Sequence, residues 1–233
     1  MLLLFTNSFM DSPVDFKASD KLFSKDPRSS DLGKKIIEQS VVLIDELGFE
    51  SFTFAKLARK IGTTEASVYR YFENKQRLLQ YLMQLYWHWM EYQLVFRTYT
   101  IKSTKDKITE ALRILVTESD DESISGISSK RLRSIVIAES SKSYLNKEVE
   151  EDNRNQLFKP YKDLCARLAE LFHERNPVYR YARSLASTII EMSHLQIYFG
   201  QHLPSLTDFS SDQGDEAVID FLQHMTDSCL RKN

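Results

Sequence analysis

The sequence predicts an all-α protein with a small N-terminal helix-turn-helix module joined by a long helix to a larger helical body. Only six glycines and five prolines interrupt its 233 residues, too few for a protein with many β-turns. Apolar residues recur at helical spacing in long unbroken segments. Two short helical segments also meet at a turn that contains Gly62. The hydrophobic content of 42% is sufficient for a core, so we expect a globular protein.

The chain divides into three predicted segments. Residues 1–28 begin with the apolar run MLLLFTNSFM, which lacks a basic flank and is too short for a signal peptide or a membrane span. We interpret this segment as a flexible leader. Residues 29–76 are predicted to form the helix-turn-helix module, and residues 77–233 the helical body. No membrane partner is expected.

The charge distribution and the cysteines narrow the class of protein. The formal net charge is −2, yet residues 51–80 hold six Lys/Arg against two Glu, which indicates a local anion-binding patch on an acidic body. Cys165 and Cys229 lie far apart, so neither a disulfide framework nor a zinc ribbon is indicated. We therefore expect a cytoplasmic protein without a cofactor.

The predicted module starts with an amphipathic helix in SSDLGKKIIEQSVVLIDELG. A serine or aspartate can cap its start, and Gly48 stands where a left-handed residue ends a helix. Thr53 can cap a short second helix, FAKLARKI, which stops at Gly62. These two helices are expected to brace the third helix of the module.

A third helix, EASVYRYF, is capped by Thr63 or Thr64. Val68 and Phe72 are spaced i, i+4, so both face inward and only a narrow stripe of this helix is buried. A three-helix arrangement of this kind can place its last helix in the major groove of DNA. The side chains predicted to face outward are Thr64, Glu65, Ser67, Arg70 and Tyr71.

The segment LGFESFTFAKLARKIGTTEASVYRYFENKQRLL resembles the DNA-binding module of the tetracycline-repressor family of bacterial regulators. The shared pattern is a glycine-aromatic pair, a threonine, an A-x-x-x-G turn and a Y-x-x-F-x-x-K segment. The remainder of the chain matches that family only in being helical. In this sequence the pattern corresponds to Gly48-Phe49, Thr53, Ala58 to Gly62, and Tyr69, Phe72 and Lys75.

The resemblance implies that Tyr69, Tyr71 and Lys75 contact the DNA backbone. Unpaired N–H groups at the helix starts near Thr53 and Asn74 can bind phosphates as well. On the third helix, glutamate can accept from cytosine, arginine can donate to guanine and alanine can meet a thymine methyl group. The predicted DNA-binding residues are Thr53, Thr63, Thr64, Glu65, Ala66, Ser67, Tyr69, Arg70, Tyr71 and Lys75.

Purely structural roles remain open for three of these residues. The ring of Tyr69 can simply cover the core of the module. Arg70 can pair with Glu73 at i, i+3 on the helix surface. Glu65 can be a helix-start residue favoured by the helix dipole.

A long helix is predicted from Asn74 to Thr100, linking the module to the body. Tyr81, Leu85, Trp89, Tyr92 and Phe96 form one stripe on it, and Trp87 and His88 lie off this stripe. Such a stripe fits either core packing or the lining of a ligand cavity. The pocket residues predicted from helix position are Trp89, Tyr92, Phe96, His88, Tyr161 and His194.

Further helices follow in the body, with SDDESISGISS read as a solvated loop between two of them. The segment ending in FKPYKDLCARLAELFHER is kinked or restarted at Pro160, and Pro177 opens the next helix. The last two long helices are candidates for a four-helix dimer interface, because palindromic half-sites require paired modules. The alternative is that they serve only the core of their own chain.

These features predict a dimeric, ligand-responsive transcriptional regulator, most often a repressor, that binds a palindromic operator in double-stranded DNA and an unknown small-molecule inducer. An enzyme is not expected, because no P-loop, GxGxxG, nucleophile elbow or HExxH motif occurs. Metal binding by isolated histidines such as His88 with Glu91, His173 with Glu174, or His194 with His202 is less favoured. A second alternative is a helical sensor that does not bind DNA.

Overall fold

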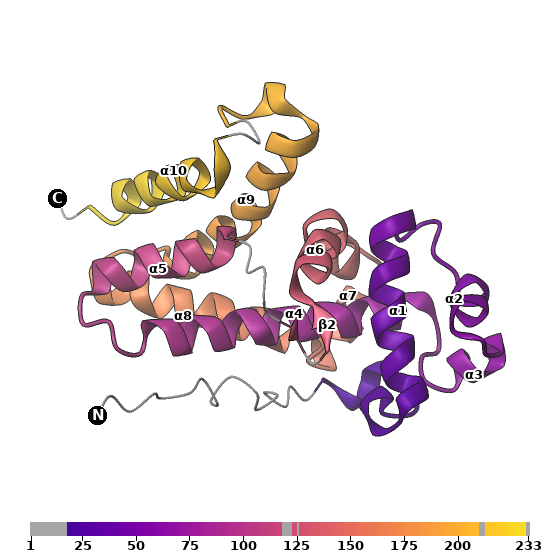
Figure 1. Cartoon of the computed structure of the whole chain (residues 1–233). Helices are drawn as coiled ribbons and strands as arrows, with labels where there is room; N and C mark the ends of the chain where they lie inside the picture. The colour runs from indigo at the N-terminus through magenta and orange to yellow at the C-terminus, as the bar shows by residue number, and fades with distance from the viewer. Residues whose placement is uncertain (1–17, 118–122, 125, 210–212, 232–233) are drawn as a thin grey trace, which may run out of the picture.

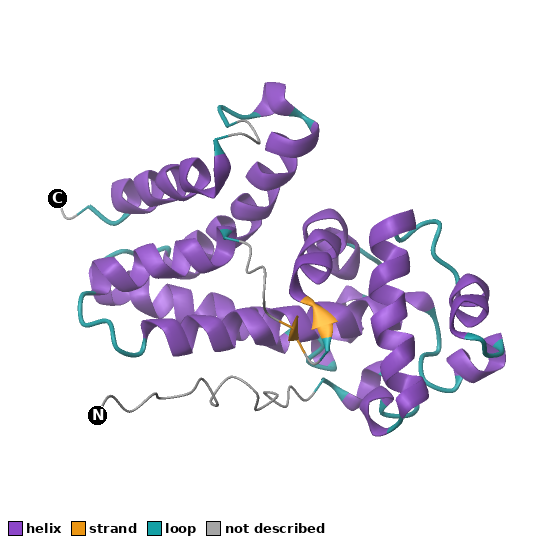
Figure 2. Cartoon of the chain, in the orientation of Figure 1, coloured by secondary structure: helices purple, strands orange, loops and turns teal. Residues whose placement is uncertain are grey.

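The structure, a computed structural model, describes residues 18–117, 123–124, 126–209 and 213–231. Ten α-helices in these residues confirm the all-α prediction (Figure 2). A module formed by α1 (Asp31–Leu47), α2 (Phe54–Ile61) and α3 (Glu65–Tyr69) lies at one end of the molecule (Figure 1). The body extends from it along α4 (Lys75–Thr98), which belongs to both parts.

The module forms where the sequence places its caps. The side chains of Ser30, Thr53 and Thr64 each accept a hydrogen bond from a backbone N–H in the first turn of α1, α2 and α3. Gly48 and Gly62 end the first two helices with φ of 74° and 70°. Because L-residues with a side chain rarely adopt this conformation, glycine is favoured at both helix ends.

The body packs its helices around α4. This helix contacts α5, α6 and α8, and α8 packs in turn on α9. Within the described residues, no helix is both long enough and apolar enough to cross a membrane. The remaining helices are α5 (Thr104–Val116), α6 (Ser129–Tyr144), α7 (Val149–Arg154), α8 (Lys159–Arg175), α9 (Ala182–His202) and α10 (Gly214–Cys229), with a short 3-10 helix η3 (Pro204–Leu206).

The expectation of a flexible leader over residues 1–28 is wrong for residues 18–28, whereas residues 1–17 lie outside the described residues. Two 3-10 turns, η1 (Asp20–Leu22) and η2 (Pro27–Ser29), pack against the module and α4. The Ser19 N–H donates to the Gln84 side chain at 2.8 Å, and the Ser24 N–H donates to the Tyr71 carbonyl at 2.9 Å. Buried Ala18 and Leu22 join the core, which explains why the segment is fixed.

The loop predicted in SDDESISGISS contains a short antiparallel pair, β1 (Ser123–Ile124) and β2 (Ile127–Ser128). Ile124 and Ile127 are both buried against the core. The prediction of a fully solvated loop is therefore wrong at these two residues, because each isoleucine gains apolar burial. Residues 118–122 and 125 lie outside the described residues.

In the second half of the chain, one of two predicted helix starts agrees with the structure. Pro160 stands in the first turn of α8, so the restart predicted there is confirmed. The next helix begins at Ala182, whereas the sequence suggested Pro177. The intervening residues form turns, one of which is closed by the Tyr179 N–H donating to the Asn176 carbonyl at 3.1 Å.

Candidate nucleic-acid interface and ligand cavity

Helix α3, the last helix of the module, is anchored by one buried side chain within it and one just beyond its end, and the rest of its surface lies outside. Val68 and Phe72 are fully buried, as their spacing predicted. Glu65, Ala66 and Arg70 are exposed. The helix is therefore held rigidly by one stripe while a polar face remains accessible to a partner.

Hydrogen bonds between side chains order this polar face. The hydroxyl oxygens of Thr64 and Ser67 lie 2.9 Å apart, and Arg70 Nη2 donates to Ser67 Oγ at 3.2 Å. Tyr69 is 49% exposed, and its ring packs edge-on against Phe54 with centroids 5.0 Å apart. Its ring thus covers the core and also reaches the surface, so the two roles considered for it are compatible.

Two further predicted contacts lie at the turns before α2 and α3. Thr53 is exposed and caps α2, while Thr63 is half-buried between the two helices. Lys56 and Arg59 of α2 are also exposed, as is Lys25. These three cations were not among the predicted DNA contacts, although the excess of basic residues in this segment was a signal for the two on α2.

Tyr71 does not face outward as predicted. It is only 3% exposed, and its hydroxyl lies 2.8 Å from Ser30 Oγ at the start of α1. The helix ends at Tyr69, so the following residues turn back under the segment that precedes α1. Lys25 lies above the Tyr71 ring at 5.1 Å, which brings a positive charge to the end of the recognition helix.

Lys75, predicted as a phosphate contact, is hydrogen-bonded within the protein. Its ammonium group donates to the carbonyl oxygens of Phe49, Glu50 and Phe52 at 3.0, 3.1 and 3.5 Å. It also lies 4.7 Å from the centre of the Phe49 ring. All three N–H donors of the ammonium group therefore have acceptors within the protein, in the turn between α1 and α2.

Arg77 points into the body. Its Nη1 donates to Asp152 Oδ1 at 2.6 Å, and Gln80 Nε2 donates to Asp152 Oδ2 at 2.6 Å. Asp152 is completely buried. This network fixes the start of α4 to α7.

A second polar network connects α6 with the turn after α1. The Lys142 ammonium lies 2.9 Å from Glu50 and 2.7 Å from Glu139. Both carboxylates raise the pKa of Lys142, chiefly through hydrogen bonds from its ammonium group. Gln76 Nε2 donates to the Lys142 carbonyl at 3.0 Å. The end of α6 is thus tied to the module at two points.

The predicted pocket residues are dispersed in the body. Trp89 lines a cavity between α4, α5 and α6. Tyr92 and Phe96 continue outward from Trp89 as a stack with 5.7 Å between successive ring centroids, and Phe96 is 63% exposed. His88 is half-buried on the same helix and lies outside this lining.

Tyr161 and His194 lie deeper in the body. Tyr161 donates to Glu191 Oε1 at 2.7 Å, and burial raises its pKa. His194 is buried and stacks on Trp87 with centroids 5.5 Å apart, so Trp87 belongs to the core although it lay off the predicted stripe. Neither nitrogen of the His194 ring has a hydrogen-bond partner in the described part of the chain. Burial, assisted by the charge of Arg133, lowers the pKa of His194 to about 3.

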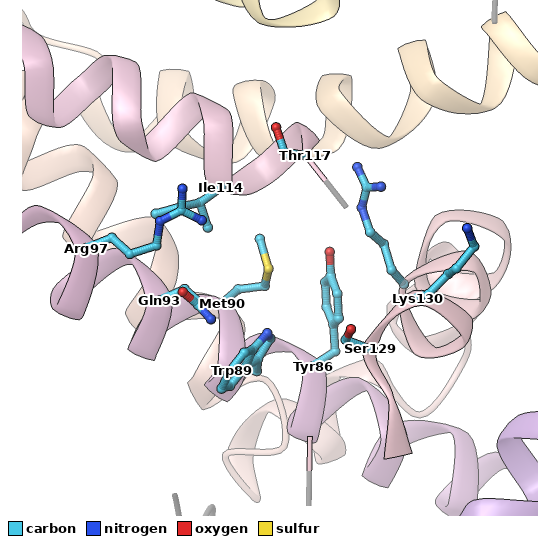
Figure 3. Close-up of a pocket in the computed structure, with 10 residues that line it drawn as sticks. Tyr86, Trp89, Met90, Gln93, Arg97, Ile114, Thr117, Ser129 and Lys130 are labelled. Carbon is cyan, nitrogen blue, oxygen red and sulfur yellow. The ribbon is translucent and has the colours of Figure 1, made fainter. Parts of the chain in front are cut away.

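The cavity between α4, α5 and α6 has a volume of about 40 Å³. Figure 3 shows Tyr86, Met90 and Ile114 facing this space, with Arg97 on one side and Lys130 on the other. Arg97 pairs with Glu110 at 2.6 Å. Tyr86 and Arg133 also line the cavity, and neither was predicted from the sequence.

A larger cavity of about 340 Å³ lies between α1, α6 and α9. Ile44 and Gly48 of the module line it together with Arg133 of α6 and Tyr198 of α9.

Among the described residues, no cluster of three or more His, Cys, Asp or Glu side chains is placed to hold a metal ion. The arrangement combines an exposed polar helix with cavities in the body.

Comparisons with known proteins agree with this arrangement. Residues 36–82 match the profile of bacterial regulatory proteins of the TetR family. The comparison with curated protein sequences gives no match.

Several solved structures share the fold. The structure of AibR in complex with isovaleryl coenzyme A and operator DNA is 19% identical, with a TM-score of 0.57 over 82% of this chain and 96% of that one. The fatty acid degradation regulator FadR from Bacillus halodurans is 16% identical, with a TM-score of 0.55 over 83% and 96%. A TetR-family regulatory protein from Rhodococcus RHA1 is 12% identical, with a TM-score of 0.59 over 87% and 96%.

The fold is a helix-turn-helix module with an exposed polar helix, joined to a larger helical body. Residues 36–82 are thus similar to the DNA-binding segment of TetR-family regulatory proteins, and the whole chain shares its fold with the solved structures.

Proposed function

We propose that the chain acts as a homodimeric repressor that binds a palindromic operator and is released by a small molecule. The observation that carries this proposal is the exposed polar face of α3, held by buried Val68 and Phe72. Glu65 and Arg70 on this face have the donor and acceptor groups that distinguish base pairs in the major groove. Exposed Lys56 and Arg59 on α2, and Lys25, supply positive charge for the flanking phosphates.

Dimerisation follows from the shortness of the recognition helix. The five residues of α3 can reach few base pairs, so specificity requires a second copy on the adjacent half-site. Exposed apolar side chains occur on α9 and the turns flanking it, among them Tyr181, Leu195, Leu203 and Leu206. We propose that α9 and α10 of two chains form a four-helix interface related by two-fold symmetry.

Ligand response would act through α4 and α6. Both helices line the cavity between α4, α5 and α6, and both are bonded to the module, α4 through Lys75 and α6 through Lys142. A ligand that binds better to one arrangement of these helices shifts the population toward it and changes the spacing of the two α3 helices. AibR, which shares the fold, has been solved with both an acyl-coenzyme A and operator DNA.

The same proposal assigns the parts of the chain. Residues 29–76 would form the DNA-binding domain and residues 77–233 the ligand-binding and dimerisation domain, in a cytoplasmic protein without catalytic activity. Residues 18–28 would belong to the DNA-binding domain, because the Ser24 N–H donates to the Tyr71 carbonyl. A direct check of the division is whether residues 18–76 bind DNA in isolation.

The decisive experiment is selection of bound duplexes from random DNA by the purified full-length protein at a stated near-physiological salt concentration. An enriched palindrome, bound by a complex whose sedimentation mass corresponds to an even number of chains, is the expected result. Enrichment of a single half-site by one chain would refute the dimer. Absence of enrichment, both alone and with a metabolite extract, would favour a sensor that does not bind DNA.

A further inference from the structure

Arg133 of α6 has a positive charge that the described residues do not neutralise. Its guanidinium donates one hydrogen bond, from Nη2 to the Val116 carbonyl, and forms no ion pair with a carboxylate in the described part of the chain. Its Nε–H is buried and has no acceptor there. A desolvated cation without an anion is costly, so an arginine in this state calls for a counter-ion.

Tyr86 of α4 presents a second unused donor beside this charge. Its hydroxyl is buried and has no partner with hydrogen-bonding geometry among the described residues. Burial is the main effect and raises the pKa of Tyr86, whereas Arg133 opposes this rise through its charge and through its closeness to the hydroxyl oxygen. At neutral pH the hydroxyl is therefore protonated and able to donate.

Both groups line the cavity between α4, α5 and α6, and the rest of its lining is partly apolar. Figure 3 shows the Tyr86 hydroxyl directed into the space that Met90 and Ile114 border. The volume of about 40 Å³ is several times the ~10–15 Å³ that one water molecule requires, but far below the ~300 Å³ of a typical drug-sized pocket. The cavity thus suits a compact group with acceptor atoms.

We propose that this cavity binds a carboxylate: one oxygen accepts from the Arg133 guanidinium, the other accepts from the Tyr86 hydroxyl, and a short aliphatic chain lies against Met90 and Ile114. An organic anion satisfies the two buried donors, whereas an amide or an alcohol leaves the guanidinium charge without compensation. The inference rests on the proposed function, since it names the chemical class of the effector. A cation is excluded by the charge of Arg133.

The position of the site indicates how it would act. Tyr86 lies on α4, the helix that starts with Lys75 in the module, and Arg133 lies on α6, the helix that ends near Lys142. A carboxylate that bridges Tyr86 and Arg133 fixes α4 relative to α6. A ligand in the cavity thereby affects the two helices, α4 and α6, through which the body is bonded to the module.

The test uses the full-length protein in a buffer free of carboxylates and phosphate. Acetate, isobutyrate and hexanoate are each titrated beside the corresponding amide at constant ionic strength, with tetramethylammonium as the cationic probe. Binding is measured by calorimetry and by tryptophan fluorescence, since Trp89 lines the cavity. We expect saturable binding of at least one carboxylate, about tenfold or more tighter than its amide, and no binding of the cation.

Two variants locate the site and one controls for charge. Arg133→Gln should abolish the preference for the carboxylate over the amide, and Tyr86→Phe, which keeps the ring and its packing, should weaken carboxylate binding several-fold. Arg167→Gln removes one positive charge from the exposed surface of α8 and should bind as the unmodified protein does. If Arg133→Gln does not fold, as judged by circular dichroism, the effect of Tyr86→Phe on carboxylate binding decides whether the cavity is the binding site.

The outcomes separate this inference from the proposed function. Equal affinity for carboxylate and amide, the absence of saturable binding by all three carboxylates, or unchanged binding by both variants would overturn the assigned ligand class. Selection of operator DNA by the ligand-free protein would still stand in each of these cases. Carboxylate binding that leaves affinity for the selected duplex unchanged would support the site but refute its regulatory role.

Discussion

The recognition module and the body arrange their polar side chains in opposite ways. In α3 the polar groups lie outside, and Thr64, Ser67 and Arg70 hydrogen-bond to one another. In the body, Tyr86, Arg133 and His194 carry polar atoms that are buried and lack partners in the described residues. The difference indicates that the polar groups on the surface of α3 already bond to one another, whereas the body has buried donors without partners that a ligand can satisfy.

The largest effect is expected where the two regions are joined. Asp152→Ala removes the buried carboxylate that accepts from Arg77 and Gln80, and so leaves Arg77 with only the exposed Glu148 carboxylate at 4.0 Å. We expect a loss of about 3–5 kcal/mol in the free energy of unfolding, measured by urea denaturation.

Glu148→Ala is the matched control for this variant. Its exposed carboxylate lies 4.0 Å from the same arginine, so the expected change is less than ~1 kcal/mol. Equal effects of the two substitutions would contradict the view that the buried network joins α4 to α7.

The second prediction concerns Lys75, whose role is structural in this account. Lys75→Met removes the donors to three carbonyl oxygens in the turn between α1 and α2 and should cost about 1.5–3 kcal/mol of stability. The salt dependence of DNA binding should stay unchanged, because the ammonium group is occupied within the protein. If the variant is as stable as the unmodified protein but its DNA binding depends less steeply on salt, Lys75 contacts a DNA phosphate instead.

A third prediction uses pH to examine the buried groups of the body. The pKa of His194 falls from 6.5 to about 3 on folding, chiefly through burial. Between these values the unfolded chain binds a proton that the folded chain does not, so acidification should remove about 1.4 kcal/mol of stability per pH unit.

His194→Phe should lack this contribution, which the difference in urea midpoints between neutral and mildly acidic pH measures. His173→Gln, at an exposed position of α8, is the control and should keep the full pH dependence. The same slope in His194→Phe and in the unmodified protein would show that other groups cause the acid sensitivity.

The smallest effect is expected at Lys25, an exposed residue near the end of α3. Lys25→Gln should weaken binding to all duplexes alike and reduce the slope of log K against log salt by about 0.9, as expected for one lost phosphate contact. Stability should barely change, in contrast to Lys75→Met. An unchanged slope would place Lys25 away from the DNA.

The sequence predicted the module well because its structure is determined locally. The caps Ser30, Thr53 and Thr64 and the helix-ending Gly62 act on residues within one turn of themselves. The partners of Lys75 and Tyr71 within the protein were not predicted, for the opposite reason. Their partners lie at residues 49–52 and at Ser30, and such distant contacts leave no trace in local spacing.

The ligand cavity could not be predicted in the same way. Much of the circumference of α4 is buried, so a helical period does not distinguish the face that lines a cavity from the faces that pack on α6 and α8. The residue pattern of KRLRSIVIAESS, residues 130–141, likewise does not indicate that Arg133 points inward. Which charge is left without a partner is decided by the packing of helices that are distant in sequence.

The most direct test of the central claim is to repeat the duplex selection with Arg70→Ala beside the unmodified protein. If α3 reads the major groove, the unmodified protein enriches a palindrome, and the variant loses preference at one base pair in each half-site, worth about 1–3 kcal/mol, while other positions are kept. An identical motif for both proteins, or a uniform loss at all positions, would contradict base reading by the exposed face of α3.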